Sequence, residues 1–234
     1  MLRVQDQPAF VLHQRPYRET SMLLEVLTRD HGRVGLLARG LRSARPRYAR
    51  GLLSPFVGLH LSFAGRGELM TLSGAEPAGA PLVLAGQALV SGLYVNELLV
   101  RLLERHDPHP DLLVRYAVLL EELAGGGDLG WTLRRFERDL LGALGFAPLL
   151  TEEAGHAAPV DPVRTYSYDP ERGPVPYGAR AVPPRVSGSS LLALAEDAVP
   201  GVESRRELKA LMRAVLRHHL GGRELNAWRT LAQR

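Results

Sequence analysis

The sequence predicts an α+β protein in which a small closed β-barrel precedes a mainly helical region. Five short apolar runs lie between residues 7 and 76, and the run at 57–63 alternates apolar and polar residues as a half-buried strand does. Longer apolar segments with helical periodicity follow within 80–146. Residues 147–186 are rich in Pro and Gly, which predicts a small irregular hairpin inserted before the last helices.

The predicted strands lie at 9–12, 22–27, 34–38, 57–63 and 69–73. A long connection at 40–55 separates the third strand from the fourth. Five short strands with one long connection fit a barrel of the OB-fold type, whose loops commonly bind nucleic acid. An SH3-like barrel is the structural alternative.

Helices are predicted at 82–103, 112–123, 129–144, 190–197, from 204 onward and at 223–233. Gly145 is placed to cap the third helix at its C-terminus. The run Ser204-Arg205-Arg206-Glu207 has the pattern of a capping box. We therefore predict four parts: an OB-fold domain at 1–79, a helical domain at 80–146, a hairpin module at 147–186, and C-terminal helices at 187–234 that pack on the helical domain.

Positive charge is concentrated in one part of the chain. The formal net charge is +4, and Lys209 is the single lysine among 29 basic residues. The window 31–67 contains seven arginines and no acidic residue, so the remainder of the chain sums to −3. A GC-rich genome explains the general preference for arginine, but a local basic cluster is typical of a polyanion site.

Arginines spaced along a loop suit a phosphate backbone, and an aromatic ring beside them offers a stacking face. The alternative is a solvated, self-repelling loop. The candidate nucleic-acid-binding residues are Arg15, Arg18, Arg33, Arg39, Arg42, Arg45, Arg47, Tyr48, Arg50 and Arg66.

Several kinds of chemistry are excluded or disfavoured. The absence of cysteine excludes disulfides, a thiol nucleophile and a cysteine-ligated metal. Lys209 has no glycine-rich loop before it, which excludes a P-loop ATPase. His106 and His109 share a proline-containing segment, which predicts a solvated loop rather than a metal site. Asn96 and Glu97 lie within an apolar helix and more often fix helix packing than catalyse a reaction. We predict no cofactor and no metal.

Five motifs follow one another along the chain: F-V-L-H-x-R-P-Y-x-E-T-S at 10–21, G-R-V-x-L-x-A-x-G-x-R at 32–42, F-x-G-R-G-E at 63–68, S-G-L-Y-V-N-E-L-L at 91–99 and L-R-R-F-E-x-x-L-L-x-x-L-G at 133–145. Together they resemble the RecO family of recombination mediators in its proteobacterial form. YSY at 166–168 and LGGREL at 220–225 match more loosely. The sequence departs from zinc-bearing members, because Glu153-Ala154-Gly155-His156 stands where a Cys-x-x-Cys pair would fall.

The resemblance implies a non-enzymatic DNA repair protein with an OB-fold and a helical domain. Such a protein binds single- and double-stranded DNA, anneals complementary strands and helps load RecA on DNA coated by the single-strand-binding protein SSB. Its expected partners are DNA, SSB and RecR. The N-terminus lacks an apolar leader and no apolar run reaches ~20 residues, so we expect a cytoplasmic, nucleoid-associated protein without a membrane.

The segment 129–144 is the predicted site for the acidic SSB tail. It places apolar side chains on one broad side, edged by arginines, as an acidic peptide with a hydrophobic end requires. The alternative from the residues alone is an ordinary core helix, and the resemblance favours the peptide site. Its candidate residues are Leu133, Arg134, Arg135, Phe136 and Arg138.

Two other functions fit parts of the sequence. An RNA-binding OB-fold protein would have the same composition and barrel. A small hydrolase using Glu97 and a histidine is the other alternative. An annealing assay without nucleotide, combined with RNA competition, separates the three.

Overall fold

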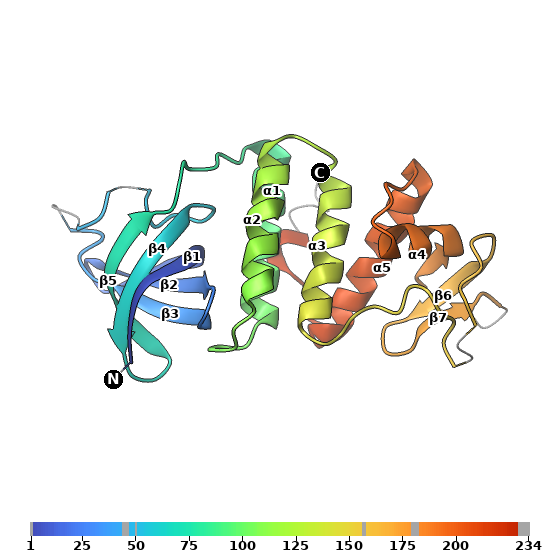
Figure 1. The fold of residues 1–234 in the computed structure, drawn as a ribbon, viewed down its shortest axis with the longest axis horizontal. Helices are drawn as coiled ribbons and strands as arrows, with labels where there is room; N and C mark the ends of the chain where they lie inside the picture. The colour runs from blue at the N-terminus through green and yellow to red at the C-terminus, as the bar shows by residue number, and fades with distance from the viewer. Residues whose placement is uncertain (1, 44–46, 50, 156–157, 179–182, 229–234) are drawn as a thin grey trace. The chain divides into compact units, whose positions relative to one another are not determined.

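The computed structural model describes residues 2–43, 47–49, 51–155, 158–178 and 183–228. The chain forms two compact units (Figure 1). The first runs to Gly126 and takes up the segment from Leu225 onward, and the second is Gly127–Glu224. The division falls at the glycine run 125–127, inside the segment 80–146 that the sequence predicts as one helical domain.

The first unit begins with a five-stranded closed barrel of order β1-β2-β3-β5-β4 (Figure 1). Only the β3–β5 pair is parallel, and β1 closes the barrel against β4. This topology is that of an OB-fold, so the barrel type is confirmed against the SH3-like alternative. The strands are β1 (Leu2–Tyr17), β2 (Ser21–Thr28), β3 (Gly32–Ala38), β4 (Gly58–Gly65) and β5 (Leu69–Pro77).

Alternation along the strands fills the barrel. Val34, Leu36 and Ala38 of β3 are buried in its core, whereas the residues between them lie on the outer side of the sheet. A bulge in β1 between Val11 and His13 shifts the register of its pairing with β2. After this bulge most side chains of β1 are exposed or half-buried, and they include Arg15 and Tyr17 of the site described below.

Two helices, α1 (Gly86–Leu102) and α2 (Pro110–Ala124), complete the first unit. Asn96 of α1 donates to the Leu12 carbonyl at 2.9 Å and accepts from the Tyr116 hydroxyl of α2 at 2.6 Å. The Tyr116 ring packs edge-on against Phe10 of β1, with ring centroids 5.1 Å apart. The packing role predicted for Asn96 is confirmed, because its buried amide ties both helices to the barrel.

The second unit combines helices with a three-stranded sheet of order β7-β6-β8. The hairpin predicted within 147–186 is present as β6 and β7. The apolar face of α3 forms part of the core, and α5 packs against α3 and α4. The elements are α3 (Leu129–Ala143), β6 (Thr165–Asp169), β7 (Gly173–Pro176), β8 (Arg185–Ser187), α4 (Gly188–Ala195) and α5 (Val202–His219).

Helix ends follow the sequence in part. Gly145 adopts φ +81° after α3, and the Phe146 amide donates to the Leu141 carbonyl at 2.8 Å, so the predicted cap is confirmed. The capping box at Ser204 is wrong. Helix α5 starts at Val202, two residues earlier, behind Gly201, which offers no side chain to cap it.

The predicted last helix is described only in part, since residues 226–228 are helical and 229–233 lie outside the described residues. No helix in the described ranges has both the length and the apolar character needed to span a membrane.

Candidate nucleic-acid interface

A basic surface surrounds the turn between β1 and β2. It lies over a depression of about 810 Å³ lined by Tyr17, Arg18, Leu37, Arg39 and their neighbours. The Arg42 amide donates to the Thr20 carbonyl at 2.9 Å, which attaches the start of the long β3–β4 connection to this turn. We call the cluster formed by Arg15, Tyr17, Arg18, Arg39 and Arg42 the barrel basic surface.

The arginines of this surface are available to a ligand. Among the described residues, none of its four guanidinium groups forms an ion pair. Arg66, in the β4–β5 turn, is likewise exposed and without an ion pair in the described part of the chain. Glu19 is the carboxylate that lines the same depression. The surface therefore carries a net positive charge on the strands and loops that OB-folds use for oligonucleotides.

Other arginines predicted to bind nucleic acid either have partners within the protein or lie outside the described residues. Arg33 forms an ion pair with Glu25 at 2.7 Å and donates to the Leu103 carbonyl at 3.1 Å, with 13% of its side chain exposed. Arg47 is exposed but donates to the Ser73 carbonyl at 2.7 Å. Arg45 and Arg50 lie outside the described residues.

Tyr48 is not the exposed stacking face that the sequence predicts. Its ring belongs to the barrel core and the residue is only 9% exposed. Burial raises the pKa of the Tyr48 phenol, and the nearby Arg47 charge opposes this only in part. The aromatic ring on the basic surface is Tyr17, with the Arg18 guanidinium 5.3 Å from its centroid. Tyr17 follows Arg15 with strand alternation after the β1 bulge, and that alternation is the signal that marks it.

The α3 residues predicted for an acidic tail are largely structural. Leu133 and Phe136 are buried in the second unit. Arg134, the first candidate, is 9% exposed, and its guanidinium binds the fully buried Glu137 carboxylate. The apolar side of α3 is therefore not exposed as the sequence predicts: it faces the core of the second unit, and Arg134 is buried with it.

The other two arginines of α3 converge on one carboxylate. Arg135 contacts Asp197 at 3.1 Å, and Arg138 contacts Asp197 at 2.9 Å and the Leu194 carbonyl at 2.6 Å. Burial raises the pKa of Asp197, but the hydrogen bond from Arg135 and the charges of both arginines outweigh it and hold the pKa below its ordinary value. Asp197 thus neutralises part of the positive charge that Arg135 and Arg138 place on this side of α3.

A second basic surface lies on α5 and escaped the sequence analysis. Arg206, Lys209, Arg213 and Arg217 are exposed. Their spacing of three, four and four residues places them on one helix face, and this spacing is the signal that finds them. The net charge of the chain outside residues 31–67 is −3, and this sum conceals the row because acidic residues elsewhere outweigh its positive charges. We call these four residues the α5 basic row.

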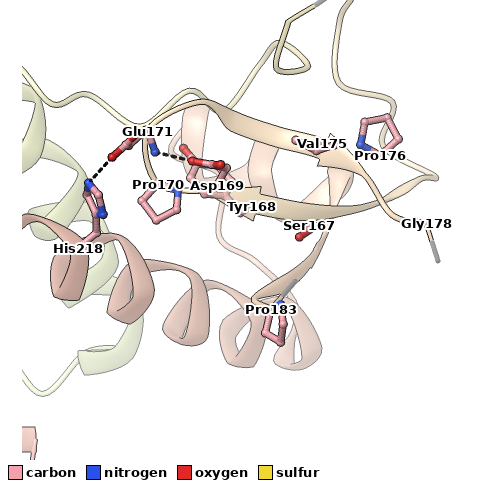
Figure 2. Close-up of a pocket in the computed structure, with 10 residues that line it drawn as sticks. All are labelled: Ser167, Tyr168, Asp169, Pro170, Glu171, Val175, Pro176, Gly178, Pro183 and His218. Carbon is pink, nitrogen blue, oxygen red and sulfur yellow. Dashed lines mark hydrogen bonds and ion pairs between the residues drawn. The ribbon is translucent and has the colours of Figure 1, made fainter. Parts of the chain in front are cut away.

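Hollows flank the α5 basic row. One of about 890 Å³ is lined by Arg185, Arg213 and Arg217 over the small Ala210 and Ala214. The next lies between the β6–β7 hairpin and α5, where His218 faces Glu171 at 3.4 Å (Figure 2). The α5 basic row thus has Ala210 and Ala214 beside it on one side and the His218–Glu171 contact on the other.

The zinc-module position holds a hydrogen-bonded network. Glu153, which stands at the first of the expected cysteines, is 8% exposed and accepts from the Tyr166 hydroxyl at 3.0 Å. The same hydroxyl accepts from the Asp161 amide at 2.9 Å, and Arg164 lies 3.7 Å from Glu153. Buried hydrogen bonds therefore contribute to holding this module together, in addition to apolar packing. No group of three potential metal ligands occurs in the described ranges.

The remaining candidates have structural settings. Glu97 accepts from Arg101 at 2.7 Å and from the backbone amides of Asn226 and Ala227 at 2.9 and 3.0 Å. Both of its carboxylate oxygens are thereby engaged, which removes the support for a hydrolase. The loop with His106 and His109 packs on β3.

The barrel topology and the exposed arginines on its outer face place the chain in the class of OB-fold proteins suited to oligonucleotides. The family profile described as Recombination protein O N terminal matches residues 1–81, and that described as Recombination protein O C terminal matches residues 84–229. The chain therefore belongs to the recombination protein O family, and its role is that of a recombination mediator in DNA repair.

Related proteins agree over nearly the whole chain. The DNA repair protein RecO of Stenotrophomonas maltophilia strain K279a is 45% identical, with 99% of this chain and 98% of the relative aligned. That of Methylococcus capsulatus is 47% identical over 96% of this chain and 92% of the relative. The DNA repair protein RecO of Burkholderia pseudomallei strain 1710b is 46% identical over 95% of this chain and 81% of the relative.

Proposed function

We propose that this mediator binds single-stranded DNA on the barrel basic surface, binds a second strand on the α5 basic row, and anneals the two without catalysing a chemical reaction. The observation that carries the proposal is the occurrence of exposed basic surfaces in both units. Annealing brings two polyanions together, so a protein that neutralises phosphates on both strands lowers their repulsion.

The barrel basic surface has the two features of a single-strand site. Its exposed arginines are suited to the phosphates, and Tyr17 offers an aromatic face for a base. Duplex DNA presents its phosphates but not its base faces, so we expect duplex to bind more weakly here.

The α5 basic row suits the backbone of a second strand. Its cations lie along one face of an 18-residue helix, so they follow a line rather than surround a point. They lie beside small residues that leave room for a strand. Contacts of this kind position a strand without reading its sequence, as annealing of arbitrary strands requires.

The family relationship supports a wider setting. We propose that the protein acts in the cytoplasm at the nucleoid, helps load RecA on SSB-coated gaps, and works with SSB and RecR. An acidic SSB tail that approaches α3 would have to displace Asp197 from Arg135 and Arg138. Arg206, Lys209 and Arg217 of the α5 basic row offer such a tail exposed cations without that displacement.

The test is annealing of complementary oligonucleotides in the absence of nucleotide, followed by fluorescence transfer between labelled strands. We expect wild-type protein to accelerate annealing. A variant with Arg206, Lys209 and Arg217 changed to Ala should keep single-strand binding and lose most of the acceleration. Full acceleration in that variant would remove the second-strand site.

RNA is the alternative ligand, because phosphates and base faces are common to both nucleic acids. Competition with RNA of the same sequence distinguishes them. Stronger displacement by RNA than by DNA would favour the RNA-binding alternative.

A further inference from the structure

A smaller depression adjoins the barrel basic surface on the same face of the barrel. Its volume is about 180 Å³, and Leu69 lines both depressions, so the two lie on either side of this side chain. A space equal to about six water molecules accommodates one nucleobase and excludes a base pair. Its lining residues include His13, Arg15, Leu23, Glu25, Gly35 and Arg105.

Arg105 forms a flat wall of this depression. Its guanidinium binds the Glu25 carboxylate and donates through Nη1 to the Glu68 carbonyl at 3.2 Å. A Cβ at Gly35 would lie 2.9 Å from Nη1 and 3.5 Å from Cζ, so the guanidinium rests directly on the strand at a residue without a side chain. The Arg105 side chain is nevertheless 29% exposed.

The charges in this depression differ from those of the barrel basic surface. Arg15 and Arg105 line it together with the carboxylates of Glu25 and Glu68; Glu25 also pairs with Arg33, and Glu68 lies 4.0 Å from Arg105. Two lining cations thus face two carboxylates. A phosphate placed here would meet both carboxylates, whereas an uncharged ring would meet leucine side chains and an ordered guanidinium plane. Base rings stack well on such planes.

We infer that this depression receives one unstacked nucleobase from a strand whose phosphates lie on the barrel basic surface. The inference rests on the proposed DNA-binding function. Leu23 and Leu69 contact the ring, and the Arg105 guanidinium stacks on it. A base inside a duplex is paired and stacked and cannot enter without being flipped out. The depression therefore makes the barrel selective for single strands.

The test compares two oligonucleotides of equal length, one of thymidine and one carrying abasic sites, by fluorescence anisotropy. Both strands have the same phosphates, so the electrostatic contribution to binding is equal. We expect wild-type protein to bind the thymidine strand about tenfold more tightly. Leu69→Gln should lose most of this preference and retain the affinity for the abasic strand.

Two further variants make the test specific. Arg105→Lys keeps a cation beside Glu25 but removes the planar surface, and it should also lose the preference. Leu93→Gln is the matched control, because Leu93 of α1 is 47% exposed and Leu69 is 46% exposed. This control should behave as wild type.

The outcomes separate the inference from the function on which it rests. Failure of wild-type protein to bind either strand would overturn the proposed function. Equal binding of the two strands would overturn the base site, and with it the stacking of a base on Tyr17, but would leave the phosphate contacts of the proposed function standing. A tenfold preference that persists in both Leu69→Gln and Arg105→Lys would also overturn it, because the base would then contact another part of the protein.

Discussion

Removing the cations around the β1–β2 turn should change how DNA binding depends on salt. The perturbation is the simultaneous change of Arg18, Arg39 and Arg42 to Ala. Among the described residues these side chains form no ion pair and are exposed, so their loss leaves no buried charge behind. Each that contacts a phosphate releases a counterion on binding, and that release sets the slope of affinity against salt.

The magnitude follows from the number of contacts. One contact on single-stranded DNA contributes ~0.7 to the slope of log affinity against log salt, so three contacts contribute about 2. A fourfold rise in salt, from ~50 to ~200 mM, should therefore weaken wild-type binding about 20-fold more than it weakens the triple variant.

The assay is a titration of labelled oligonucleotide by fluorescence anisotropy at several salt concentrations. Arg29→Ala is the control, because Arg29 is also exposed on the barrel but lies 2.9 Å from Asp30 in an ion pair. We expect its slope to match that of wild type. An unchanged slope in the triple variant would refute the assignment of phosphate contacts to this surface.

Three other predictions concern the second unit. Arg134→Glu should lower the free energy of unfolding by about 3–5 kcal/mol in denaturant titrations, because it leaves Glu137 buried beside a like charge; wild-type stability would refute the burial. Tyr166→Phe should cost ~1–3 kcal/mol by leaving Glu153 without its hydroxyl donor, and a chelator should change neither protein; one zinc per chain by elemental analysis would contradict this. Burial raises the pKa of Glu207, but hydrogen bonds from Ser190 and Ser187 outweigh it and hold the pKa below its ordinary value. The ionised carboxylate therefore stabilises the fold fully above the ordinary pKa, and this stabilisation is lost as pH falls through the lowered one. The free energies of unfolding of wild type and Glu207→Gln should thus converge in acid; a constant difference between them would argue otherwise.

The strands and helices were largely predictable because burial imposes a period. The alternation at 57–63 marks β4, and the apolar segment at 129–144 corresponds closely to α3. The barrel type also follows from strand number and loop length, and β3–β5 pairing settles it.

Side-chain settings were harder to predict because they depend on partners that periodicity does not specify. Tyr48 lies in a basic loop, yet its ring fills the barrel core. Arg134 looks like the border of an apolar face, but Glu137 one turn later neutralises it and allows both to be buried. The division of the chain after Gly126 likewise depends on which neighbour each helix packs against, a long-range property.

The Tyr166–Glu153 network has a consequence for the conditions under which this protein folds. Zinc-thiolate modules lose their metal when peroxide oxidises the cysteines or when zinc is scarce. The Tyr166 phenol and the Glu153 carboxylate form a hydrogen bond that contains no thiolate, and the sequence contains no cysteine. The oxidation of cysteine that dismantles a zinc-thiolate module therefore has no target in this chain.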